Sequence, residues 1–194
     1  MRARSGGFSL IEIAVVLVVV AVLAAALTPL VTNYIDEARR TRAARDAQTI
    51  AESILAFYRN TGKWPIFQSG VSITTTSLYY DTLFSAGSMP TTTDADWTSA
   101  SRLSLSSVLE RNEPVYTTVG RFAWRGPYLT ALGTDPWGNA YIVNAKSLRY
   151  GVNKAGFVLS AGPDGIIQTA FDQDIGSGSS AVAVAGDDIV ARLR

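Results

Sequence analysis

Five aspartates lie close together near the C-terminus and could hold a metal ion. They are Asp164, Asp172, Asp174, Asp187 and Asp188. No lysine or arginine occurs between Lys154 and Arg192. Carboxylates crowded into one loop region repel each other unless they stay apart in solvent or a cation bridges them, and calcium takes about six to eight oxygen ligands. The residues alone leave two interpretations open, a solvated acidic loop and a calcium site.

A single carboxylate, Glu12, lies near the start of a long apolar segment. In residues 8–31 only Ser9, Glu12, Thr28 and Pro29 interrupt the apolar side chains. A helix of about 24 residues is roughly 36 Å long, which is enough to cross the roughly 30 Å hydrocarbon core of a bilayer. An unpaired carboxylate is costly in hydrocarbon, so we expect Glu12 to pair with a positive charge and to have a function.

A cleaved secretory signal peptide is the alternative interpretation of this segment. The apolar core of such a peptide is usually about 7–15 residues long and ends at a small-residue cleavage site. Ala24-Ala25-Ala26 could serve as that site. The length of the apolar run and the early carboxylate favour a membrane helix instead.

The composition excludes most common catalytic chemistry. The 194 residues include no histidine and no cysteine, which removes Ser-His-Asp and Cys-His catalysis, histidine or thiolate metal sites and disulfides. Asp94 and Asp96 could in principle do acid–base work, but no nucleophile or base stands at a recognisable spacing from them. No enzyme is therefore predicted. Lys+Arg 17 against Asp+Glu 16 gives a net charge of +1 and no electrostatic case for nucleic acid as a partner.

The apolar segment should continue as one helix well beyond the membrane. Residues 36–60 contain neither glycine nor proline, and apolar residues recur there at helical spacing. These residues are Ala47, Ile50, Ala51, Ile54 and Tyr58. Gly62 and Pro65 should end the helix. We predict one helix of about 50 residues whose second half packs one face on a globular domain.

The remainder predicts an α+β fold, in which the long helix packs on a small C-terminal antiparallel sheet. Short strands are expected at residues 140–145, 156–160, 166–170 and 181–185. Residues 66–125 should form an enlarged loop with short extended pieces, and a short helix is expected at residues 103–112.

The five residues 135–139, Asp-Pro-Trp-Gly-Asn, predict a tight turn. Proline fixes φ, glycine permits positive φ, and the Asp and Asn side chains can bond back to the backbone. Trp137 and Tyr141 should contribute large buried faces to the core. A structural role for this turn is favoured over a ligand-binding role.

Residues 7–12, with the sequence Gly-Phe-Ser-Leu-Ile-Glu, followed by the apolar helix and Pro29, resemble the class III signal of type IV pilins and type II secretion pseudopilins. The resemblance implies that a prepilin peptidase cuts between Gly7 and Phe8 and methylates the new amino terminus of Phe8. Glu12 would then pair with the Phe8 amine of the next subunit. Pro29 would be either a tolerated helix proline or a joint that lets the helix stretch on assembly.

The same resemblance divides the chain into four parts. They are a leader peptide at 1–7, a transmembrane part of the helix at 8–31, an exported amphipathic half at 32–62, and a globular pilin-like domain at 63–194 with the enlarged loop 66–125.

Stretches in the second half resemble the major pseudopilin of type II secretion systems. They are residues 126–129, 135–141, 159–165 and 186–189. In that family the C-terminal stretch forms a calcium-binding loop over a small antiparallel sheet. The resemblance implies that calcium is held by the side chains of Asp164, Asp187 and Asp188 and by the carbonyls of Ala161 and Ile166.

The resemblance implies a structural subunit that polymerises into a periplasmic pseudopilus and drives type II protein secretion. The chain would wait as a single-pass protein of the bacterial inner membrane, with its C-terminal domain in the periplasm. Its partners would be further copies of itself, pilin-like minor subunits, the inner-membrane assembly platform and the prepilin peptidase. The arginines oppose this orientation, because more of them follow the span than precede it.

Two alternatives remain. The first is a type IV pilus subunit for adhesion or motility, although many such pilins carry a C-terminal disulfide loop that this chain cannot form. The second is a membrane-anchored binding module that uses aromatic residues of the long insertion, such as Trp97 and Trp124.

Overall fold

The computed structural model describes residue 7 and residues 9–68, 78–98, 101–130, 133–173 and 182–193. The predictions that concern residues 1–6, Phe8 and Asp174 lie outside this part of the chain. The chain divides into two compact units, Met1–Arg39 and Arg40–Arg194.

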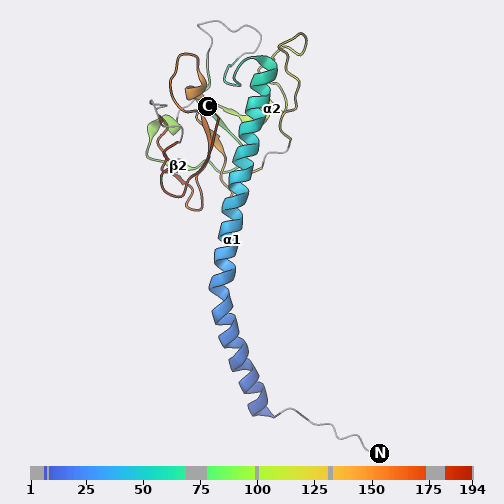
Figure 1. The fold of residues 1–194 in the computed structure, drawn as a ribbon, viewed down its shortest axis with the longest axis vertical. Coiled ribbons are helices and arrows are strands. Elements are labelled where there is room, and N and C mark those ends of the chain that lie inside the picture. The colour runs from blue at the N-terminus through green and yellow to red at the C-terminus, as the bar shows by residue number, and fades with distance from the viewer. Residues whose placement is uncertain are drawn as a thin grey trace, which may run out of the picture. The chain divides into compact units, whose positions relative to one another are not determined.

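Helix α1 runs from Leu10 to Thr61 and has 52 residues (Figure 1). At its start the Ser9 hydroxyl accepts a hydrogen bond from the Glu12 N–H at 3.2 Å, as an N-cap serine does. At its end Gly62 adopts φ 68, and its N–H donates to the Tyr58 carbonyl at 2.8 Å. A left-handed residue of this kind closes helices because glycine has no Cβ to oppose it. The predicted long helix and its end at Gly62 are confirmed.

In the first unit, the described residues of α1 from Leu10 to Arg39 are exposed, and most of them are apolar up to Val31. The Thr28 hydroxyl donates to the Ala24 carbonyl at 2.7 Å, so this polar group is satisfied within the helix. By length and composition α1 could cross a membrane.

In the second unit, one stripe of α1 enters the core. Ala47, Ile50, Ala51 and Ile54 are buried, as predicted. The stripe continues through Phe57, which is fully buried, and the prediction for Tyr58 was wrong because that ring is 39% exposed. Tyr58 instead stacks on the indole of Trp64 at the surface, with ring centroids 4.3 Å apart.

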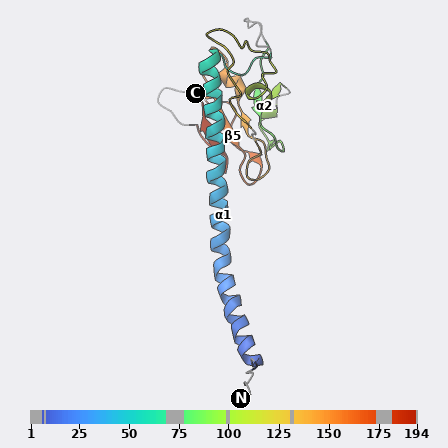
Figure 2. The same cartoon turned by 90° about the vertical axis from the view of Figure 1, so that its right-hand side faces the viewer.

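The sheet beside α1 has five strands and is mixed (Figure 2). In spatial order the strands are β3 (Arg102–Ser104), β1 (Thr82–Phe84), β4 (Ile142–Val143), β5 (Phe157–Ser160) and β7 (Ile189–Arg192). The pair β1–β3 is parallel and the other three pairs are antiparallel. The α+β fold is confirmed, but the purely antiparallel sheet was wrong, because β1 and β3 both come from the segment expected to be a loop.

Residues 66–125 contribute more structure than an enlarged loop. Besides β1 and β3 they form β2 (Thr91–Thr92), the 3-10 helix η1 (Ala95–Thr98) and the short helix α2 (Leu105–Leu109). Strand β2 pairs in parallel with β6 (Ile166–Ile167), which makes a separate two-stranded sheet. The predicted helix at 103–112 is therefore shorter than expected. Its apolar residues Leu105, Val108 and Leu109 are fully buried.

Three of the four expected strand positions hold strands, namely β4, β5 and β6. The fourth was wrong, because the described residues 182–185 form no strand and β7 begins at Ile189. The backbone N–H groups of Ala183 and Ala185 donate to the side chains of Gln173 and Thr169 instead of to a strand.

The five-stranded sheet has a core on each face, because successive strand residues point to opposite sides. Val143 and Val158 belong to the cluster that contains the buried stripe of α1. Ile142, Phe157 and Leu159 belong to a second cluster with Trp97 and Phe171. Helix α1 therefore covers one face, and η1 with the residues after β6 covers the other.

The predicted turn at 135–139 is confirmed. One carboxylate oxygen of Asp135 accepts from the N–H groups of Trp137 and Asn139, at 3.0 and 2.7 Å, and the other accepts from the Ser160 hydroxyl at 2.8 Å. Tyr141 is buried as expected, whereas Trp137 is only half-buried. The bonds of Asp135 are those of a structural carboxylate.

Candidate functional site

Glu12 lies in the first turn of α1 and is exposed. Among the described residues it has no ion-pair partner. Its position is electrostatically favourable, because the N-terminal end of a helix carries a partial positive charge. The carboxylate is therefore accommodated in the free helix and remains available to a cationic group outside the described residues.

Asp164 lies in a turn between β5 and β6, and Asp187 and Asp188 lie in a turn just before β7. These turns approach closely. A Cβ placed on Gly162 would come 2.6 Å from the Asp187 carbonyl oxygen and 3.0 Å from its carboxylate. The structure therefore brings residues 161–169 against residues 185–188, as the predicted ion-binding loop requires.

Asp188 is the most buried of the three predicted carboxylate ligands, with 7% exposure. Its Oδ2 accepts from the backbone N–H groups of Gln168 and Thr169 at 2.9 and 2.6 Å. Its Oδ1 is buried and has no hydrogen-bond partner of ordinary geometry among the described residues, although the Thr169 side chain lies close enough to lower the pKa of this carboxyl. Burial raises the pKa of Asp188, the bonds from Thr169 and Gln168 lower it, and the nearby charge of Asp187 raises it again.

Asp187 also has a buried carboxylate oxygen, Oδ1, without a partner. Its backbone N–H donates to the Gln168 side-chain oxygen at 3.2 Å. Two neighbouring aspartates thus each keep one buried oxygen unsatisfied, which is costly unless a donor or cation reaches it.

Asp164 is exposed and already bonded. Its Oδ1 accepts from the Ile166 N–H and its Oδ2 from the Gln168 side-chain amide, both at 2.8 Å. Ala161 is fully buried beside this turn. The proposed carbonyl ligands at Ala161 and Ile166 stay predictions.

Gln168 is the residue that sequence analysis missed. It contacts Asp164 and Asp187 through its side chain and Asp188 through its backbone N–H. In the described part of the chain no three acidic side chains converge closely enough to hold a metal. Gln168 therefore links the three predicted aspartates, but its side-chain amide contacts the carboxylate of Asp164 alone. A neutral side chain gives no charge pattern that could have revealed this role.

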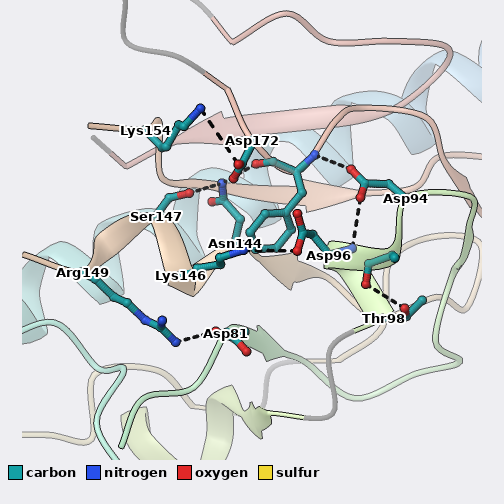
Figure 3. A network of polar contacts seen from close by, with 12 residues as sticks. Asp81, Asp94, Asp96, Thr98, Asn144, Lys146, Ser147, Arg149, Lys154 and Asp172 are labelled. Atoms are coloured by element: carbon teal, nitrogen blue, oxygen red, sulfur yellow. Dashed lines mark hydrogen bonds and ion pairs between the residues drawn. The ribbon is translucent and has the colours of Figure 1, made fainter. Parts of the chain in front are cut away.

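Asp172, the remaining described aspartate of the cluster, pairs with Lys154, with 4.0 Å between the charged groups (Figure 3).

Residues 94–96, which follow β2, bond to the acidic loop, the name used here for residues 161–173 and 185–188 (Figure 3). One carboxylate oxygen of Asp94 accepts from the Phe171 N–H at 2.9 Å, and the other accepts from the Asp96 N–H at 3.0 Å. Asp96 pairs with Lys146 at 3.2 Å. These bonds give both aspartates structural partners and offer no support for the acid–base role weighed for them.

Trp97 and Trp124 do not form an exposed binding surface. The Trp97 ring is 2% exposed, and its indole N–H donates to the Thr169 carbonyl at 2.9 Å. Trp124 is half-buried, and its indole N–H donates to the Val108 carbonyl at 3.1 Å. The suggestion that these two rings bind a ligand was therefore wrong, since both serve the fold.

A different aromatic group lines a surface hollow of about 260 Å³ at the end of α1. Its rings are Tyr58, Trp64, Phe67, Tyr79 and Tyr150. Lys63 adds a positive charge to the same hollow. Hollows of this kind, apolar with a few polar groups, are common for small ligands.

Buried Asn144 connects the acidic loop to the sheet (Figure 3). Its amide nitrogen donates to the carbonyls of Ala155 and Phe171 and to the Ser147 hydroxyl, at 2.7, 3.2 and 3.1 Å. Its oxygen accepts from the Phe157 N–H at 2.7 Å. The position of Phe171 is thus fixed by Asn144 on one side and Asp94 on the other.

Comparison with known proteins adds one match. A family model described as the prokaryotic N-terminal methylation motif matches residues 2–28, which include Gly7, Phe8 and Glu12. No curated protein and no solved structure matches the chain. The motif is a type IV pilin-like prepilin signal, and it indicates a subunit that a prepilin peptidase processes and that assembles into a filament.

Proposed function

We propose that this pilin-like chain is cleaved between Gly7 and Phe8 and polymerises into a periplasmic pseudopilus that drives type II protein secretion. The observation that carries the proposal is the methylation motif at residues 2–28, which opens an apolar helix with a free carboxylate in its first turn. The role is structural, so no substrate is turned over.

Cleavage would convert Glu12 from an isolated acid into half of a pair. The cut frees an α-amino group on Phe8, four residues before Glu12. In apolar surroundings each of these charges is costly alone, so the amine of one subunit and Glu12 of the next favour a single register of contact. A contact repeated head to tail without closing makes a helical filament.

The exposed apolar half of α1 supports storage in a membrane before assembly. Its described side chains from Leu10 to Val31, all but that of residue 29, are exposed and are not buried by other described residues. Lipid tails would cover them first, and neighbouring copies of the same helix would cover them in the filament. The proposed orientation has the C-terminal domain in the periplasm.

Substitution of Glu12 tests the pairing. We expect Glu12→Ala and Glu12→Gln to abolish or derange filaments while the protein still accumulates in the membrane, and Glu12→Asp to keep part of the assembly. Electron microscopy of overexpressing cells provides the measurement. Normal filaments from Glu12→Ala would contradict the pairing mechanism.

An adhesive or motile type IV pilus would assemble by the same pairing of Glu12 with the Phe8 amine and the same burial of the apolar helix. Imaging separates the two, because a pseudopilus gives short periplasmic assemblies and a pilus gives long surface fibres. Loss of secreted proteins from a deletion strain, without loss of surface fibres, would favour the pseudopilus.

We propose calcium as the ion of the C-terminal loop. The side chains of Asp164, Asp187 and Asp188 would hold it, with carbonyls such as those of Ala161 and Ile166. Support comes from the two buried carboxylate oxygens of Asp187 and Asp188 that have no partner. When bound, calcium would supply the positive charge that lets these carboxylates lie close together. A melting temperature of the full chain that is the same in calcium and in chelator would contradict this proposal.

The aromatic hollow beside Tyr58 and Trp64 keeps a membrane-anchored binding module as a second candidate. Binding of exported proteins or sugars to the full chain, lost on Trp64→Ala, would support it.

A further inference from the structure

The side-chain amide of Gln168 lies between the two parts of the acidic loop. Its nitrogen donates to Oδ2 of Asp164 at 2.8 Å, and its oxygen accepts from the N–H of Asp187 at 3.2 Å. A Cβ on Gly186 would lie 1.6 Å from that oxygen, so the amide fits only because residue 186 is glycine.

The amide does part of the work that a cation would do. Its NH₂ group carries partial positive charge and places it against the Asp164 carboxylate. Meanwhile Asp187 and Asp188 each keep a buried oxygen without a partner. The arrangement holds Asp164 on the amide, while one oxygen each of Asp187 and Asp188 lacks a partner among the described residues, where no three acidic side chains converge.

We propose that the Gln168 side chain acts as a latch, which keeps the acidic loop ordered when no metal is bound. Calcium, when it binds, displaces this side chain from Asp164. The proposal rests on the calcium site proposed above. Because the amide donor and the ion compete for the same carboxylate, Gln168 weakens calcium binding and reduces the loop's dependence on the ion. Gln168 is solvent-exposed, so its side chain can leave Asp164 without opening the core. Its backbone N–H stays on Asp188 in either state.

The chain offers a matched control in the same loop. Gln173 also bridges two segments by its amide, donating to the carbonyls of Ala170 and Ala183 and accepting from the Ala183 N–H. It bonds to backbone groups only, so its loss should matter equally with and without calcium.

The test compares thermal unfolding of the full chain in detergent, followed by tryptophan fluorescence, in excess calcium and in excess chelator. We expect Gln168→Ala to lower the melting temperature by about 2–4 °C in chelator and by less than half as much in calcium. Gln168→Glu places a carboxylate beside Asp164, so it should lower the value further in chelator and recover in calcium. Gln173→Ala should lower both values equally. Calcium titration by calorimetry should show about tenfold tighter binding to Gln168→Ala.

The outcomes separate the latch from the ion site. If calcium stabilises the native chain and Gln168→Ala by the same amount, the ion site stands and the latch is overturned. If calcium stabilises neither, the ion site fails and the latch fails with it. If calcium stabilises both chains, but Gln168→Ala more than the native chain, both the ion site and the latch are supported, because the native amide then competes with the ion.

Discussion

At the residue scale, a few buried polar groups decide which segments meet. Asn144 is fully buried and satisfies four partners from three segments of the chain. Such a hub cannot be recognised from its neighbours in sequence, because the Phe171 carbonyl that it binds lies 27 residues away. The charge pattern drew attention to the acidic cluster, whereas nothing in the sequence pointed to the amides of Asn144 and Gln168.

Asn144→Ala should lower the free energy of unfolding by about 2–4 kcal/mol, because it strands a buried N–H and two buried carbonyls. Urea denaturation of the full chain in detergent measures this. Asn153→Ala, at an exposed position, should change the value by no more than about 0.5 kcal/mol. Similar values for the two variants would contradict the role of Asn144 as a hub.

Two buried tyrosines predict that the stability of the fold decreases at alkaline pH. Burial raises the pKa of Tyr116, and burial together with Asp46 raises that of Tyr141. An unfolded tyrosine ionises near pH 10, so each raised pKa contributes stability that is complete below about pH 10 and falls as the pH rises above it.

Phenylalanine substitutions distinguish the contributions of the two tyrosine hydroxyls to stability. Among the described residues the Tyr116 hydroxyl has no hydrogen-bond partner of ordinary geometry, although the Phe67 backbone lies close enough to lower its pKa. Tyr116→Phe should therefore be nearly neutral at pH 7 and should flatten the loss above pH 10. The Tyr141 hydroxyl donates to Asp46 at 3.2 Å, so Tyr141→Phe should cost about 0.5–1.5 kcal/mol at pH 7. An unchanged alkaline slope in both variants would contradict the assignment.

At the scale of elements, the spacing of apolar residues predicted the helix, whose contacts join residues that are close in the sequence. Helix α1 was predicted within about two residues at each end, because 3.6-residue spacing and Gly62 are read along the chain. Short extended pieces were expected around β1 and β2, but their positions and pairing could not be predicted, because each strand has only two or three residues and depends on distant partners. The Thr92 hydroxyl, for example, bonds to the Ile167 carbonyl 75 residues away.

The attachment of η1 to the acidic loop predicts that substituting Asp94 destabilises the fold more than substituting Asp96. Asp94→Ala leaves the backbone N–H groups of Phe171 and Asp96 without their carboxylate, and should cost about 2–3 kcal/mol. Asp96→Ala removes only an exposed ion pair with Lys146 and should cost about 0–1 kcal/mol. Hydrogen exchange should also quicken at residues 166–171 in Asp94→Ala alone. Equal exchange in both variants would show that η1 does not hold the loop.

At the scale of the whole molecule, one chain carries an N-terminal processing signal and a folded C-terminal domain. The signal could be predicted because cleavage, membrane insertion and pairing depend on residue types at fixed spacing along one helix. The machine that the filament serves could not be predicted in the same way, because that depends on surfaces that other proteins contact.

The most direct test of the central claim is the mass of the mature N-terminus, measured on protein purified from its membrane. We expect a chain that begins at Phe8 and carries a methyl group on its α-amine, and we expect Gly7→Ala or deletion of the peptidase to block the cut. A chain that begins just after Ala24–Ala26, as after signal-peptide cleavage, or one that retains Met1–Gly7 in assembled protein, would contradict it.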